Sequence, residues 1–189
     1  MGGPLVGILA LQGDFEAHRK ALERAGARSL QVRTAEELER VDGLVIPGGE
    51  SSTMIKLLRA EKLLEPLRRF GERRPIFGTC AGAILLARHV TRPEQESLGL
   101  MDLDVERNAY GRQLASRVAQ LEETEGGPLE AVFIRAPIVR RVGPGVRVLA
   151  RYNGDPVLVE QGLHMAATFH PELTDDPRVH RLFLGKIAA

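Results

Sequence analysis

The first 90 residues alternate between short apolar runs and segments with apolar side chains at helical spacing. No other feature of the sequence limits the possible folds as much as this alternation. The apolar runs lie at residues 5–10, 30–32, 43–46 and 75–77. Strands that are each followed by a helix build a parallel sheet with right-handed crossovers and helices on both faces. The sequence therefore predicts an α/β fold with a mostly parallel, doubly wound sheet of the flavodoxin-like kind.

Local signals place the helices of this half. Thr34 and Glu37 have the spacing of a capping box, which predicts a short helix from that point. A further helix is expected from about Thr53, and another across residues 64–70. The helix-prone run after residue 80 is expected to extend to about His89.

After residue 98 the pattern changes to short strand-like runs separated by turn residues. The runs lie at residues 100–105, 114–121, 131–134, 146–152, 157–161 and 164–169. Asn153-Gly154 lies between two of them, and this dipeptide is a strong signal for a tight hairpin. We expect these strands to extend the sheet in antiparallel fashion, followed by a closing helix over about residues 176–187.

Length, charge and cysteine content limit the class of protein. The chain has 189 residues, a net charge of +1 and one cysteine. This length predicts a single domain over residues 1–189, and a lone cysteine forms no internal disulfide. No segment has the pattern of a signal peptide or the length of a membrane span. We therefore expect a cytoplasmic protein with neither nucleic acid nor a membrane as partner.

The segment Gly78-Thr79-Cys80-Ala81-Gly82 joins the fourth apolar run to a helix-prone run. This is the layout of a nucleophile elbow, a strand-turn-helix that presents a reactive side chain and needs glycine where the backbone passes closely. Unpaired amides and the helix dipole at such a position favour a thiolate. The pattern favours Cys80 as a nucleophile, and a buried structural cysteine is the alternative.

A cysteine nucleophile needs a base, and the chain has five histidines. Four of them are expected to have packing or surface roles: His18, His89, His164 and His180. His170 differs because it follows the last apolar run and stands two residues before Glu172, on the same side of an extended chain. The carboxylate of Glu172 can orient the imidazole, as the third member of a triad does. An ordinary loop is the alternative.

Gly48-Gly49 follows the third apolar run and suits a second requirement of acyl transfer. Backbone amides stabilise the tetrahedral oxyanion when a loop approaches closely, and the elbow adds the amide of Ala81. An ordinary turn is the alternative. Because ligands bind beyond the carboxyl ends of parallel strands, Gln12-Gly13 should gather at the same edge as Gly48-Gly49 and Cys80.

Three motifs in this order resemble the class I, triad-type glutamine amidotransferase family: Pro47-Gly48-Gly49, Gly-x-Cys-x-Gly around Cys80, and His170-Pro171-Glu172. Longer segments are similar to one branch of that family, the glutaminase subunits of pyridoxal 5′-phosphate synthases. These segments are residues 7–13, 47–51, 78–82, 105–108, 133–137 and 169–174. The resemblance spans the whole chain.

The resemblance implies that L-glutamine is hydrolysed to glutamate and ammonia by a triad of Cys80, His170 and Glu172. It places glutamine binding on Gly48, Gly49, Glu50, Arg107, Ile134 and Arg135, and contact with the partner on Gln12. That partner is the synthase subunit, the ammonia acceptor, in a large hetero-oligomer. A guanidinium and a carboxylate suit a free amino acid, although the two arginines are also ordinary surface residues by composition. We expect neither a cofactor nor a metal.

Three alternatives stay open at this point. The chain resembles, less closely, a glutaminase subunit that serves another synthase, for example in histidine biosynthesis. A stand-alone cysteine hydrolase of the same fold and a non-catalytic regulatory subunit are the others. Residues 10–13 and 134–137 favour the pyridoxal branch by resemblance, and the intact Cys80, His170 and Glu172 disfavour the regulatory subunit.

Overall fold

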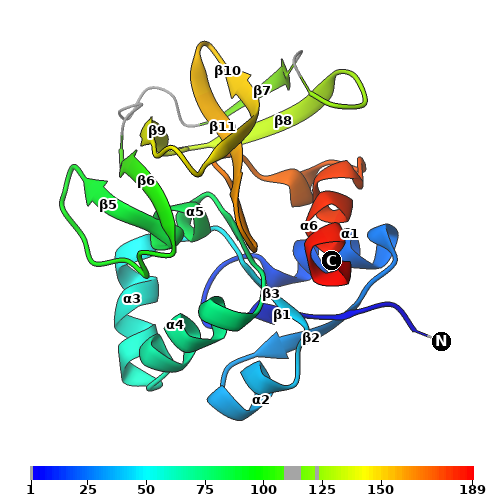
Figure 1. Ribbon diagram of the computed structural model, residues 1–189, viewed down its shortest axis with the longest axis vertical. Helices are drawn as coiled ribbons and strands as arrows, with labels where there is room; N and C mark the ends of the chain where they lie inside the picture. Colours follow the sequence, from blue (N-terminus) through cyan, green and yellow to red (C-terminus); the bar gives the residue numbers. More distant parts are fainter. Residues whose placement is uncertain (1, 109–115, 122–123) are drawn as a thin grey trace.

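The computed structural model describes residues 2–108, 116–121 and 124–189 (Figure 1). The helices are α1 (Phe15–Ala25), α2 (Ala35–Glu39), α3 (Ser51–Ala60), α4 (Leu64–Arg73), α5 (Ala81–Leu86), the short 3₁₀ helix η1 (Pro171–Leu173) and α6 (Arg178–Ala188). The strands are β1 (Leu5–Leu9), β2 (Arg28–Val32), β3 (Gly43–Ile46), β4 (Ile76–Thr79), β5 (Ala87–Thr91), β6 (Met101–Glu106), β7 (Ser116–Leu121), β8 (Leu129–Ile134), β9 (Ile138–Val142), β10 (Arg147–Tyr152), β11 (Asp155–Gln161) and β12 (His164–Ala167).

The central sheet has seven strands in the order β10-β11-β12-β4-β3-β1-β2. The neighbours from β12 to β2 are all parallel, whereas β11 runs antiparallel to both β10 and β12. The mostly parallel sheet predicted from the alternation is therefore confirmed. Its carboxyl edge gathers the loops that follow β1, β3, β4 and β12.

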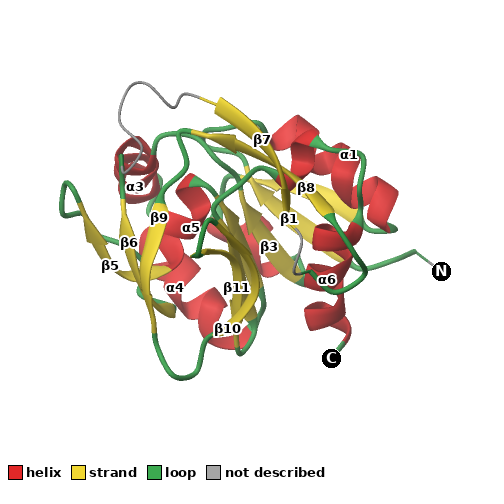
Figure 2. Cartoon of the chain, turned by 90° about the horizontal axis from the view of Figure 1, so that it is seen from above, coloured by secondary structure: helices red, strands yellow, loops and turns green. Residues whose placement is uncertain are grey.

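Helices cover both faces of this sheet, as predicted. Figures 1 and 2 show α1 and α6 together on one face, with α3, α4 and α5 on the other. Two apolar clusters fill the space between the layers. Leu22 and Phe183 belong to the first cluster, and Met54 and Phe70 belong to the second. No helix among the described residues is long and apolar enough to cross a membrane.

The antiparallel strands predicted for the second half are present, but not all of them extend the central sheet. Only β10, β11 and β12 join the central sheet, while β5-β6-β9 and β7-β8 form separate sheets. Strand β9 was not predicted, because Arg140 and Arg141 interrupt its apolar pattern. Strand β9 pairs with β6, where Arg141 donates to Asp102 at 2.5 Å. The partner of this strand is therefore distant in the sequence, and the local pattern does not reveal it. Leu114, at the start of a predicted strand, lies outside the described residues.

The helix after Cys80 is shorter than predicted. It ends at Leu86, and the chain continues as β5, so His89 lies on a strand. The amides of Leu98 and Leu100 donate to the carbonyls of Leu85 and Leu86 at 2.7 and 3.0 Å. A longer helix would need those carbonyls as acceptors for its next turn, but they already accept from the amides of Leu98 and Leu100.

The remaining local signals are confirmed with one small shift. The hydroxyl of Thr34 accepts from the amide of Glu37 at 3.2 Å and caps α2. Helix α3 begins at residue 51, two residues earlier than predicted, because its cap is a glutamate side chain. Asn153 and Gly154 both have positive φ, 50° and 83°, as the tight turn between β10 and β11 requires.

Candidate active site

The loops at the carboxyl edge pack so closely that only glycine fits at two positions. A Cβ on Gly13 would lie 2.0 Å from the carbonyl oxygen of Gly48. A Cβ on Gly48 would lie 2.6 Å from Cε1 of His170 and 3.4 Å from Cβ of Cys80. The structure therefore brings the loops after β1, β3, β4 and β12 into contact around one thiol.

Cys80 occupies a strained turn between β4 and α5. Its φ is 51° and its ψ is −107°, a conformation that a residue with a side chain adopts only when its surroundings impose it. The amide of Cys80 donates to the carbonyl of Ala167 at 2.8 Å. A Cβ on Gly82 would lie 2.1 Å from the carbonyl oxygen of Ile46, so this glycine lets α5 approach the sheet.

His170 and Glu172 form the buried pair beside the thiol. Nδ1 of His170 lies 2.6 Å from Oε1 of Glu172, and the Glu172 side chain is 2% exposed. The amide of His170 donates to the carbonyl of Val132 at 2.8 Å, and the following residues form η1. This geometry fixes the ring orientation and leaves its other nitrogen for Cys80.

The charges of this pair follow from its surroundings. Burial lowers the pKa of His170, but hydrogen bonds and charge attraction from Cys80 and Glu172 outweigh burial and raise that pKa to about 10. For Glu172, burial raises the pKa, yet the hydrogen bond from His170 and the neighbouring imidazoles hold it below its usual value. At neutral pH the pair is an imidazolium and a carboxylate.

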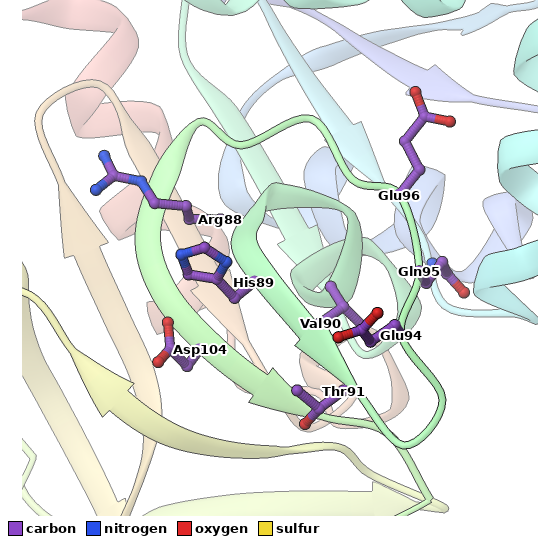
Figure 3. Close-up of a pocket in the computed structure, with 8 residues that line it drawn as sticks. All are labelled: Arg88, His89, Val90, Thr91, Glu94, Gln95, Glu96 and Asp104. Carbon is purple, nitrogen blue, oxygen red and sulfur yellow. The ribbon is translucent and has the colours of Figure 1, made fainter.

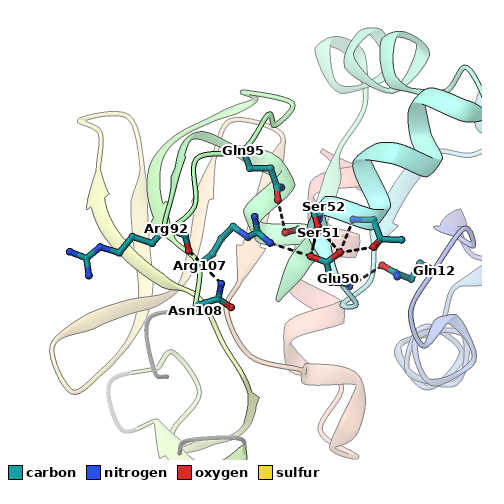
Figure 4. A network of polar contacts seen from close by, with 9 residues as sticks. Gln12, Glu50, Ser51, Ser52, Arg92, Gln95, Arg107 and Asn108 are labelled. Carbon is teal, nitrogen blue, oxygen red and sulfur yellow. Dashed lines mark hydrogen bonds and ion pairs between the residues drawn. The ribbon is translucent and has the colours of Figure 1, made fainter. Parts of the chain in front are cut away.

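Glu50 lies at the centre of a polar network that joins the loops after β1, β3 and β6 (Figure 4). Its amide donates to Oε1 of Gln12 at 2.9 Å, and Nη2 of Arg107 lies 3.2 Å from its Oε1. Hydrogen bonds from the side chains of Ser52 and Thr53 lower the pKa of Glu50 to about 2. Three of the predicted site residues are thus joined directly.

The last two predicted binding residues end strand β8. The carbonyl of Ile134 lies 3.8 Å from Sγ of Cys80, within reach of a weak hydrogen bond from the thiol. Arg135 follows with a φ of 45°, in an exposed turn. The structure therefore places Ile134 beside the thiol, while no hydrogen bond or ion pair within the described residues joins Arg135 to the other predicted site residues.

Sequence reasoning missed the contact of one histidine with the predicted triad. His18 and His180 are fully buried, as expected for packing residues. However, Nε2 of His18 lies 3.5 Å from Oε2 of Glu172, and Nδ1 of His18 lies 3.1 Å from Nε2 of His180. No local motif marks a histidine in the helix after β1, so only packing of that helix reveals the contact.

A hollow of about 710 Å³ lies away from the thiol, along β5 and the segment that follows it (Figure 3). Arg88, His89 and Asp104 line one part of it, and residues 94–96 line another. None of the predicted site residues lines this hollow. His89 is exposed there, which agrees with the second of the two roles predicted for it, packing or surface.

The fold and the elbow thiol define the class: this is an α/β protein of the class I glutamine amidotransferase-like fold. A solved structure described as a glutamine amidotransferase is similar to it with a TM-score of 0.91 and 50% identity, covering 97% of this chain and 99% of that chain. The structure of PurLQS from Thermotoga maritima has a TM-score of 0.69 at 17% identity, covering 100% of this chain and 96% of that one, and it shares the fold alone.

The chain belongs to the SNO glutamine amidotransferase family, whose family model matches residues 8–189. One relative is the pyridoxal 5′-phosphate synthase subunit PdxT of Solibacter usitatus, which is 61% identical over 189 residues, covering 96% of this chain and 98% of the relative. The subunit PdxT of Thermus thermophilus is 54% identical over 183 residues, covering 95% of this chain and 96% of that one.

Proposed function

We propose that this protein hydrolyses L-glutamine to L-glutamate and ammonia, and delivers the ammonia to the synthase subunit of a pyridoxal 5′-phosphate synthase. The observation that carries the proposal is the arrangement at the sheet edge. Cys80 lies on a strained elbow, and beside it Nδ1 of His170 is 2.6 Å from Oε1 of Glu172. The nearly full-length similarity to subunits named PdxT supports the choice of acceptor.

In the first half of the proposed reaction, the thiolate of Cys80 attacks the carboxamide carbon of glutamine. The backbone amides of Gly49 and Ala81 stabilise the resulting oxyanion. The His170 imidazolium gives its proton to the leaving nitrogen, the C–N bond breaks, and ammonia departs. A glutamyl thioester on Cys80 remains.

In the second half, the now neutral His170 removes a proton from water, and the resulting hydroxide attacks the thioester carbon. The C–S bond breaks, glutamate leaves, and Cys80 returns to the thiolate with His170 protonated. Glu172 stays ionised throughout and holds the ring in one tautomer. Each cycle consumes one glutamine and one water.

Substrate recognition is assigned to the charged groups and backbone around the thiol. The guanidinium groups of Arg107 and Arg135 suit the α-carboxylate of glutamine. The Glu50 carboxylate, with its pKa of about 2, and the carbonyl of Ile134 suit the α-ammonium. Gly48 has no side chain, which lets its loop approach the His170 ring and Cys80 closely, so its backbone can border the substrate.

The partner is assigned to the same edge. We place Gln12 at the contact with the synthase subunit, within a larger hetero-oligomer, because it bonds the amide of Glu50 next to the proposed oxyanion loop. Residues 1–189 act as one glutaminase domain in this proposal. The cytoplasm is the proposed compartment, because a thiolate nucleophile stays reduced there.

The test is to mix the chain with the synthase subunit of a pyridoxal 5′-phosphate synthase and measure glutamate and ammonia. A synthase subunit from histidine biosynthesis serves as the control partner. We expect activation by the first partner alone, loss of turnover in Cys80→Ala and His170→Ala, and a smaller loss in Glu172→Gln. Turnover in Cys80→Ala, or activation by the control partner, contradicts the proposal.

A further inference from the structure

Behind Glu172, on the side away from His170, lies a buried cluster that the proposed mechanism does not use. Oε1 of Glu172 is bonded to His170, but Oε2 is buried and has no hydrogen-bond partner among the described residues. Nε2 of His18 lies 3.5 Å from this oxygen. A buried carboxylate oxygen without a donor is costly, so this contact is the one expected to shorten in the working enzyme.

The packing of the helices fixes the His18 ring in place. His18 lies on α1, and its Nε2 is also 3.2 Å from Oγ1 of Thr79, the last residue of β4. Its other nitrogen faces His180 of α6, whose ring packs edge-on against Phe77 with centroids 5.9 Å apart. Three elements that are distant in the sequence, α1, β4 and α6, thus meet at the His18 ring.

The hydrogen-bond geometry selects one tautomer for both rings. If Nδ1 of His18 carried the proton, it would donate to His180, whose own proton would then sit on Nδ1. That nitrogen is buried and has no partner among the described residues, so an N–H group would be left unsatisfied. The lone pair on Nε2 of His18 would also face the Glu172 carboxylate. In the opposite arrangement, His180 donates to His18 and His18 donates from Nε2. Nδ1 of His180 then keeps an unpaired lone pair instead of an unpaired N–H group, and an N–H group of His18 faces the carboxylate.

The titratable groups around this cluster agree with neutral rings. Burial lowers the pKa of His18 to about 3, against the attraction of Glu172, and the neighbouring His180 and His170 lower it further. Burial and then the charge of Arg24 lower the pKa of His180 to about 4. At neutral pH His18 therefore acts on Glu172 as an N–H donor and not as a counter-ion.

We propose that His18 is a positioning residue for the proposed glutaminase reaction: its Nε2–H donates to Oε2 of Glu172 and holds the carboxylate in line with His170, while His180 fixes the tautomer of His18. The inference rests on the proposed function only for its activity readout. In this arrangement the buried chain runs from Cys80 through His170 and Glu172 to His18 and His180.

The experiment compares His18→Leu, which removes the donor, with His18→Gln, whose amide nitrogen can still donate. His164→Gln is the matched control, since His164 is also buried but accepts from the amide of Ile76 at the other end of β4. Glutamine turnover is measured from pH 5 to 9 in the complex with the synthase subunit, with kcat and KM separated. Alkylation of Cys80 by iodoacetamide is followed over the same pH range in the chain alone.

We expect His18→Leu to lower kcat by about 10- to 100-fold with little change in KM, because a misplaced carboxylate weakens the whole triad. Its acid limb of kcat should move to higher pH, since Glu172 has lost a donor that favours its ionised form. His18→Gln should recover most of the rate. His164→Gln should leave kcat and the pH profile unchanged, even where the melting temperature falls.

Three outcomes overturn the inference. These are a wild-type kcat and pH profile in folded His18→Leu, equal losses in His18→Leu and His18→Gln, and an equal shift in His164→Gln. If His18→Leu does not fold, His180→Leu replaces it, with a smaller loss of kcat and the same direction of pH shift expected. If the wild-type complex does not hydrolyse glutamine, the proposed function fails, while the pH dependence of Cys80 alkylation still decides the role of His18.

Discussion

Nη2 of Arg107 lies 3.2 Å from Oε1 of Glu50, so two residues predicted to bind glutamine are paired with each other. The Arg107 side chain is 12% exposed and the Glu50 side chain is 49% exposed. The same carboxylate also caps α3, which leaves it anchored while the guanidinium is free to exchange partners. An arriving substrate carboxylate would compete for Arg107, and the substrate ammonium would take its place at Glu50.

Arg107→Lys should raise KM for glutamine by about tenfold, because lysine cannot make the planar two-point contact of a guanidinium. Arg135→Lys should act in the same direction. The alkylation rate of Cys80 should stay at the wild-type value in both variants. Arg151→Lys is the control, because this exposed side chain lies on β10, and it should change neither quantity. Equal losses of glutamine turnover and thiol reactivity would indicate a structural role instead.

Gln12→Ala should weaken activation by the synthase subunit while the thiol keeps its intrinsic reactivity. The side chain of Gln12 holds the amide of Glu50, and a Cβ on Gly49 would lie 2.9 Å from its Oε1, so it sets the position of the proposed oxyanion loop. Losing one oxyanion donor costs about 10²–10³ in kcat. The measurement is glutaminase activity with and without partner. Full activity of the wild-type chain alone would contradict the idea that docking switches it on.

Gly82→Ala should destabilise the protein strongly, by about 3 kcal/mol, because its Cβ would lie 2.1 Å from the backbone oxygen of Ile46. Gly185→Ala is the matched control, since no atom lies within 4 Å of a Cβ at that position in α6. That change should stabilise the protein by up to about 1 kcal/mol through helix propensity. Urea unfolding of both variants checks the pair, and similar midpoints would show that the elbow tolerates a side chain.

The free energy of unfolding should fall as pH drops from about 6.5 to 4. The pKa values of His18 and His180, about 3 and about 4, lie below the unfolded value of 6.5. Between these values the unfolded chain binds protons on both rings, whereas the folded chain does not. Each group then contributes up to about 1.4 kcal/mol per pH unit in that window. The raised pKa of His170 acts elsewhere: its contribution is complete below 6.5 and is lost as pH rises towards 10.

Urea titrations at pH 7, 6 and 5 test this pH dependence. His180→Gln should reduce the slope of unfolding free energy against pH by about half. In this variant only His18 still binds a proton in the unfolded chain and not in the folded chain. A stability that is flat over this range would mean that the two imidazoles protonate without unfolding the chain.

The sequence alone determined the features that depend on short spans of chain. The alternation before residue 90 predicted the parallel sheet, and Asn153-Gly154 predicted the hairpin between β10 and β11. The glycines around Cys80 predicted the elbow. The predicted contact of His170 with Glu172 is present, but residues 171–173 form a 3₁₀ helix and not the extended segment from which the contact was predicted. Turn chemistry and side-chain periodicity act within about ten residues, so these signals survive without knowledge of the fold.

Only the tertiary structure decided the features in which distant segments compete or meet. Helix α5 ends early because residues 97–100 return to bond its last carbonyls. Strand β9 pairs with β6, and its arginines meet acidic side chains across that pair. The contact between His18 and Glu172 depends on where α1 docks against the sheet, 154 positions away in the chain. Burial, hydrogen-bond competition and charge pairing across such distances are properties of the packed molecule, and no local pattern encodes them.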